Sequence, residues 1–201
     1  MAIRFSKCPT WWIRDPQIGL IKFGGGKSAG LNIAALKCFL AISTSIDFHS
    51  QKAKLSISDL EALTGLSRPM VIRGLQVLVE RGMVKVDKTA HIYEYELTST
   101  RKDEGWGKIP YERMRKQLPE ILNRGAIPLT ALKIYLLLIS LRPNGSESIP
   151  INYETMLGYL GCQRAHIRPA LDILYSHTLV RITLEGSDAR QRHNVYTILG
   201  I

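Results

Sequence analysis

Apolar positions in the first half of the chain follow the period of a helix. Val71, Leu75 and Leu78 are spaced by four and then three residues, so they share one face of a helix that we predict over 67–81. A shorter apolar segment lies before it, and Gly65 supplies a tight turn between the two. The pattern therefore predicts a short helix, a turn and a longer helix.

The flanking segments extend this series. Residues 31–45 are apolar enough for a buried helix, and residues 54–57 form a brief extended piece. Ser58 is the expected cap of the short helix. Alternating segments at 83–86 and 91–97 predict a β-hairpin with the polar tip "DKTA".

The same series is predicted a second time. Shifting the sequence by 96 residues places "ALKCFL" (35–40) on "ALKIYL" (131–136) and Gly65 on Gly161. The register persists for about fifty residues, which points to a duplicated unit. The second series consists of a helix at 128–141, an extended piece at 149–152, a short helix capped by Asn152 or Tyr153, a longer helix at 164–177, and strands at 179–185 and 194–199.

The expected fold is mainly α with small β-hairpins, of the α+β class, in two tandem units. The polar segment 98–105 marks the boundary, so the predicted domains are 1–100 and 101–201. Each begins with an aromatic lead-in, "WWIRDPQIGLIKFGGG" or "WGKIPYERMRKQLPEILNRG". Trp11, Trp12 and Trp106 in these lead-ins could stack on bases, but packing against the helices is favoured.

Charge narrows the partners. The 201-residue chain has 27 Lys and Arg against 17 Asp and Glu, a formal net charge of +10. This excess of positive charge favours a polyanionic partner, and nucleic acid is the commonest one. The alternative is a basic protein that binds no polyanion. Three scattered cysteines indicate reduced thiols, and the apolar run at 134–141 is too short to span a membrane. We expect a cytoplasmic, nucleoid-associated protein without a signal peptide.

Residues 55–97 resemble winged-helix DNA-binding domains, through "LTGLSRPMVIRGLQVLVERGMV" followed by the hairpin. In that family the second helix of the motif enters the major groove. The resemblance implies a core of Leu60, Leu63, Leu66, Val71, Leu75 and Leu78, and a groove-facing set of Ser67, Arg68, Met70 and Arg73. Arginine can fork onto guanine or grip phosphate. A surface helix with solvated arginines is the alternative.

The second unit departs from this pattern. Its equivalent residues are Gln163, Arg164, His166 and Arg168, but Pro169 falls where the first unit has Arg73. Proline fits only the first turn of a helix, so this helix is expected to begin late.

The hairpin tips supply further candidates for phosphate or minor-groove contacts. These are Lys85 and Lys88 in the first wing, and Arg190, Arg192 and His193 in the second. The alternative, which is equally favoured, is that both tips are solvated charged loops that do not contact DNA.

Other chemistry is not expected. "FGGGKSAG" at 23–30 ends like a phosphate-binding loop but has Ile21 where the pattern needs its first glycine. We interpret it as a glycine loop whose Lys22 and Lys27 could touch a DNA backbone. The five histidines lack metal-site spacing, so neither a metal, a cofactor nor a catalytic group is predicted.

Three functions stay open at this point. The sequence resembles winged-helix transcription regulators, and its paired layout also resembles plasmid and phage replication initiators. The third is an interaction scaffold of the tandem winged-helix type found in chromosome segregation, although those proteins tend to be acidic. Double-stranded DNA is the expected partner, a homodimer is left open, and regulation is slightly favoured because no second catalytic or helicase-loading segment is visible.

Overall fold

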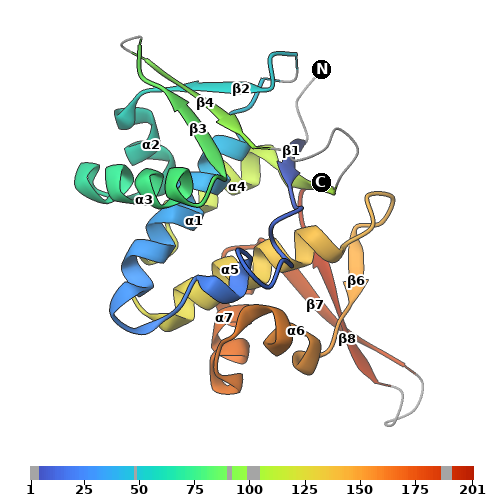
Figure 1. Cartoon of the computed structure of the whole chain (residues 1–201). Coiled ribbons are helices and arrows are strands. Elements are labelled where there is room, and N and C mark those ends of the chain that lie inside the picture. The colour runs from blue at the N-terminus through green and yellow to red at the C-terminus, as the bar shows by residue number, and fades with distance from the viewer. Residues whose placement is uncertain (1–4, 48, 90–91, 99–104, 187–191) are drawn as a thin grey trace.

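Each half of the chain places helices against a three-stranded antiparallel sheet (Figure 1). The computed structural model describes residues 5–47, 49–89, 92–98, 105–186 and 192–201. The first half contains α1 (Ala29–Ser43), β2 (Lys52–Leu55), α2 (Ile57–Thr64), α3 (Arg68–Glu80), β3 (Val84–Asp87) and β4 (Tyr93–Leu97). Its sheet has the order β2-β4-β3, so β4 pairs with β3 in the hairpin and with β2 on its other side.

The second half has the same order of elements. It contains α5 (Ala126–Leu141), β6 (Ser148–Pro150), α6 (Tyr153–Leu160), the 3₁₀ turn η3 (Arg164–His166), α7 (Ile167–Ser176), β7 (Val180–Glu185) and β8 (His193–Ile198). The sheet order is β6-β8-β7. The mixture of helices with small sheets confirms the expected α+β class.

The two most apolar helices, α1 and α5, form the centre of the molecule. Helices α1 and α5 are buried along almost their whole length, because nearly every position is apolar, and they pack against each other. Helix α3 packs on α1 at Gly74, where an added Cβ would lie 2.7 Å from the carbonyl carbon of Ala34. The largely buried α5 also confirms the buried helix expected at 134–141. Among the described residues, no helix is long and apolar enough to cross a membrane.

The two lead-ins pair with each other. Strand β1 (Phe5–Pro9) and strand β5 (Trp106–Pro110) form an antiparallel ribbon centred on the pair Lys7 and Lys108. The lead-ins then continue through η1 (Leu20–Lys22) and η2 (Gly26–Ser28) before α1, and through α4 (Tyr111–Gln117) before α5. Trp12 is buried and meets Phe39 of α1 edge-on, with 5.1 Å between ring centroids, as expected for an anchor.

A buried lysine in each central helix links the two halves. Lys37 of α1 donates hydrogen bonds from Nζ to the carbonyl of Thr64 at 2.8 Å and to that of Ile121 at 2.5 Å. Thr64 ends α2 of the same half, whereas Ile121 belongs to the lead-in of the other half.

Lys133 of α5 makes the corresponding bonds to Leu160, at the end of α6, and to Phe23, 3.0 Å away in the first lead-in. Each amine therefore joins its own helix-turn-helix to the opposite lead-in.

Several expectations need correction. The cap of α2 is Ser56 and not Ser58, which is exposed within the helix. The first extended piece lies two residues earlier than predicted, at Lys52–Leu55, because it pairs with β4. The other core positions are buried, but Leu63 is only partly so. Trp106 is 37% exposed, because its ring stacks on Phe5 at the ribbon surface instead of entering the core.

Lys37→Met tests the bridge between the halves. We expect the variant to lose about 1–3 kcal/mol of unfolding free energy at pH 7, because two buried carbonyls lose their donor. Burial lowers the pKa of Lys37 from 10.5 to about 8. Above pH 8 the buried amine is neutral in the folded state, so its desolvation no longer reduces the unfolding free energy of the wild type. The gap between wild type and variant should therefore widen, by about 1 kcal/mol between pH 7 and 9.

Denaturant unfolding at pH 7, 8 and 9 measures this gap, with Lys116→Met as a control at an exposed lysine of α4. The buried thiol of Cys8 has a pKa raised to about 12, which lowers stability above pH 9 in all three proteins alike. A gap that is absent, or that narrows with pH, would contradict the assigned role of Lys37.

Candidate nucleic-acid interface

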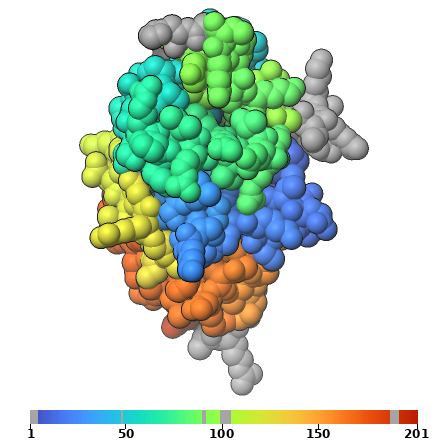
Figure 2. All heavy atoms as spheres, turned by 60° about the vertical axis from the view of Figure 1, so that its left-hand side comes forward, coloured from blue at the N-terminus to red at the C-terminus, as the bar shows by residue number. Residues whose placement is uncertain are grey.

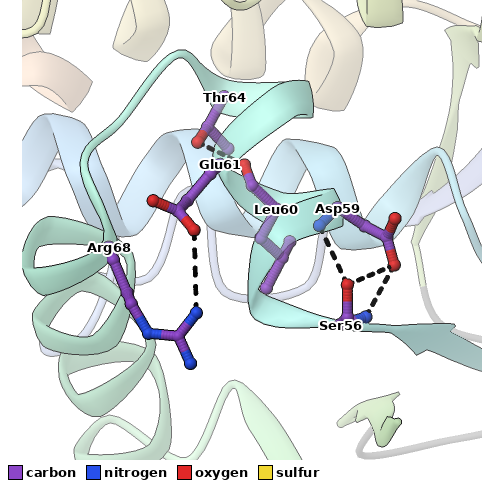
Figure 3. Close-up of polar contacts among 6 residues, drawn as sticks. All are labelled: Ser56, Asp59, Leu60, Glu61, Thr64 and Arg68. Atoms are coloured by element: carbon purple, nitrogen blue, oxygen red, sulfur yellow. Dashed lines mark hydrogen bonds and ion pairs between the residues drawn. The ribbon is translucent and has the colours of Figure 1, made fainter.

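Helix α2 begins at a reciprocal cap that fixes its direction (Figure 3). The Asp59 backbone N–H donates to Ser56 Oγ at 3.1 Å, and the Ser56 N–H donates back to Asp59 Oδ2 at 2.7 Å. The hydrogen bonds from the hydroxyl and the N–H of Ser56 hold the pKa of the Asp59 carboxyl below its usual value. In the second half, Asn152 Oδ1 accepts from the Thr155 N–H at 2.8 Å, which confirms one of the two expected caps.

The turn between α2 and α3 is tied down from several sides. Gly65 adopts the left-handed conformation, with φ 66°, and ends α2. Thr64 Oγ1 donates to the Leu60 carbonyl at 2.5 Å, as Figure 3 shows. Asn123 of the opposite lead-in donates from Nδ2 to the Gly65 carbonyl at 2.6 Å. The angle at which α3 leaves the turn is therefore set by both halves of the chain.

Helix α3 offers an open amino terminus. Ser67 is its N-cap residue, but the Ser67 side chain makes no capping hydrogen bond, and the residue is exposed. Pro69 stands in the first turn, where a missing N–H costs nothing. The unsatisfied backbone N–H groups and the Ser67 hydroxyl together suit a phosphate oxygen.

The predicted groove-facing residues of α3 differ in their surroundings. Arg68 is exposed and lies 3.9 Å from Glu61 of α2, an exposed ion pair that stabilises little (Figure 3). Arg73 is exposed and makes no hydrogen bond or ion pair within the described part of the chain. Met70 is half-buried against the core, so it offers less surface than expected. The guanidinium groups of Arg68 and Arg73 are therefore the accessible donors.

Two of the corresponding residues of the second half face acidic side chains. Arg164 is paired with Glu154, and Arg168 Nε lies 3.3 Å from Asp172 Oδ1. Gln163 is exposed, and His166 is half-buried.

The α-helix of α7 starts at Ile167 after a 3₁₀ turn, later than the predicted residue 164, and Pro169 falls in its first turn. The late start that the proline indicated is confirmed.

The wings carry part of the predicted basic set. Lys85 on β3 is exposed and lies opposite Glu96 of β4 in the hairpin register. Lys88 is exposed, with Nζ 6.0 Å from the centroid of the Tyr93 ring. In the second wing, Arg192 and His193 are exposed at the start of β8, and Arg190 lies outside the described residues.

The two helix-turn-helix units can be seen from one side of the molecule. Figure 2 shows α2 and α3 (teal to green) above α6 (orange), with the first lead-in and the start of α1 (blue) between them. The exposed Lys22 and Lys27 belong to this intervening segment. Arg81 at the end of α3 donates to the Lys22 carbonyl at 3.1 Å, and its guanidinium lies 4.1 Å from the Phe23 ring centroid.

Sequence reasoning missed the two lysines that hold this arrangement. Their signal was visible, because Lys37 and Lys133 are identical residues at equivalent positions of two otherwise apolar helices. No group of His, Cys, Asp or Glu within the described ranges could hold a metal ion.

Gly65→Ala tests the packing of the turn. A Cβ at Gly65 would lie 2.6 Å from the carbonyl oxygen of Pro119 in the opposite lead-in, whereas one at Gly82 would have nothing within 4 Å. Both glycines have φ of 66°, so both alanine variants carry the same backbone strain, about 1–2 kcal/mol. We expect Gly65→Ala to lose about 2 kcal/mol more than Gly82→Ala in denaturant unfolding. Equal losses would show that the lead-in does not press on the turn.

Part of the chain is similar to a known protein family. Residues 48–88 match the family model of the IclR helix-turn-helix domain. No curated protein matches the chain. The matched residues run from the loop before β2 through α2, the turn and α3 to the start of the first wing, so this part of the chain is a helix-turn-helix DNA-binding domain.

Proposed function

We propose that the protein is a transcription regulator that binds double-stranded DNA in a sequence-specific manner through α3. In this arrangement α3 lies in the major groove, and Arg68 and Arg73 reach base edges. Ser67 and the open amino terminus of α3 hold a backbone phosphate. Met70 is near enough to the exposed face to contribute an apolar contact.

One observation carries this proposal. The residues that match the IclR helix-turn-helix model include an exposed arginine, Arg73, that has no partner among the described residues. An arginine without an internal partner keeps all its donors for a ligand. The formal net charge of +10 supports a polyanionic ligand.

We infer a different task for the second half, which we interpret as a duplicate of the first. Both arginines at the start of the second motif helix, Arg164 and Arg168, face acidic side chains, whereas in the first half Arg68 does and Arg73 does not among the described residues. Arg190, Arg192 and His193 in the second wing, with Lys85 and Lys88 in the first, are proposed to contact phosphates. Because the units share one side of the molecule (Figure 2), both can meet one duplex.

The family match favours regulation over the other functions considered. Nothing in the comparisons supports a replication initiator or a segregation scaffold. The deciding experiment is selection of bound DNA from a random pool with the full chain, followed by mapping of the selected sequence. Regulation predicts sites that overlap promoters. Sites confined to repeats at a replication origin, or no enrichment at all, would contradict it.

Alanine variants test which half reads the sequence. Arg73→Ala or Arg68→Ala should weaken binding to the selected duplex by about 1–3 kcal/mol, and much less to scrambled DNA, if each side chain forks onto a guanine. Arg168→Ala is the matched control at an exposed arginine of α7 that faces Asp172, and it should weaken both duplexes equally and slightly. Titrations at several salt concentrations supply the measurement.

The same titrations report the phosphate contacts. Neutralising about five to eight phosphates gives a slope of roughly −4 to −7 for log affinity against log salt. Arg192→Ala should make this slope shallower by about one unit without changing the preference for the selected duplex. If Arg168→Ala erases that preference while Arg73→Ala leaves it intact, the second half is the reader.

A further inference from the structure

A large cavity lies beside the first winged helix, away from α3. Its volume is about 790 Å³, within the range of small-molecule sites. The described residues around it come from β1, the end of α1 with the following loop, β2, β5 and α4. Figure 1 shows α3 on the opposite side of α1 from β1 and α4, so an occupant of the cavity would leave α3 accessible.

Aromatic rings form one wall of this cavity. Phe5 and Trp106 line it, and each is 37% exposed, so both rings keep part of their apolar surface in water. The two rings are stacked, with centroids 6.5 Å apart and planes 15° from parallel. Tyr111 of α4 adds a third ring. A flat apolar ligand would cover surface that now faces water.

Cations form the other part of the lining. Lys7, Lys54 and Arg115 line the cavity, and Asp47 is the one carboxylate among the described lining residues. That carboxylate already accepts the backbone N–H groups of His49 at 3.1 Å and Ser50 at 2.8 Å, which close its own turn. Lys7 Nζ lies 4.9 Å from the centroid of the Trp106 ring. The charges of the described residues that line the cavity therefore sum to a positive value.

Arg115 is held in position to bind an anion. Its Nη1 donates to Ser45 Oγ at 2.9 Å, and the guanidinium lies 5.1 Å from the centroid of the Tyr111 ring. The bond to Ser45 uses one of five N–H donors, so the others remain for a ligand. A guanidinium fixed by two contacts loses little entropy when it pairs with a carboxylate or phosphate.

We propose that this cavity binds a small aromatic acid, with the ring system against Phe5 and Trp106 and the carboxylate or phosphate on Arg115. The walls come from both halves of the chain: residues 5–7, 44–47, 49, 51, 54 and 55 belong to the first half, and Trp106, Tyr111 and Arg115 to the second. A bound acid would therefore contact the first winged helix and the second lead-in at once.

The test is calorimetric titration of the full chain with 1-naphthoate. Two related probes separate the contributions: 1-naphthylmethylamine keeps the rings with a positive charge, and cyclohexanecarboxylate keeps the anion without an aromatic system. We expect one saturable site for 1-naphthoate and at least about tenfold weaker binding of each related probe.

Variants then assign the binding to this cavity. Arg115→Gln and Trp106→Leu should each weaken 1-naphthoate about tenfold, and Lys54→Gln, at an exposed position of β2, should weaken it about threefold. Arg124→Gln and Tyr175→Leu are matched controls at exposed positions outside the cavity and should bind like wild type. Circular dichroism checks the folding of each variant.

Three outcomes would overturn the proposal. The first is no saturable binding of 1-naphthoate at millimolar concentration. The second is equal affinity for the amine, which would remove the role of the cations. The third is wild-type affinity in the folded Arg115→Gln, Trp106→Leu and Lys54→Gln variants, which would place the ligand elsewhere.

Discussion

Two buried amines determine how this chain is put together. Lys37 and Lys133 lie in helices that are otherwise mostly apolar. Lys37 donates to the carbonyl of the last residue of α2, and Lys133 to that of the last residue of α6. A helix carboxyl terminus attracts positive charge, so the ammonium group is placed where the backbone favours it. Burial nevertheless lowers the pKa of both side chains to about 8, which shows the desolvation that these hydrogen bonds must offset.

The second hydrogen bond of each lysine makes the interaction a link between halves. Ile121 and Phe23 belong to lead-ins that come from the other half, so each lead-in packs on the opposite helix-turn-helix. A Cβ at Gly161 would lie 2.7 Å from Ile21 of the first lead-in, just as one at Gly65 would meet the second. Together with the β1–β5 ribbon, these contacts orient α3 and α7 relative to each other.

The local parts of this structure were predictable from sequence. Periodic apolar residues located the helices and hairpins, and Pro169 indicated the late start of α7. The cap of α2 was placed wrongly because Ser56 and Ser58 both precede acidic residues, and only the reciprocal bond with Asp59 distinguishes them. Periodicity could not show that Leu63 would be only partly buried, since that depends on neighbouring elements.

The exchange of lead-ins could not be predicted. Lys37 and Ile121, which this hydrogen bond joins, are far apart in sequence. Nothing local in either segment specifies the other as its partner. The cavity beside β1 is beyond sequence reasoning for the same reason, because three distant segments form it. The lysines repeated within two apolar helices indicate that the core must contain hydrogen-bond acceptors for their amines.

The most direct test of the exchange is to produce residues 1–100 and 101–201 as separate chains. If each half needs the lead-in of the other, neither fragment alone should melt cooperatively by circular dichroism. An equimolar mixture should recover a cooperative transition and a one-to-one complex. A fragment 1–100 that melts cooperatively near the temperature of the full chain, and gains nothing from 101–201, would contradict this account.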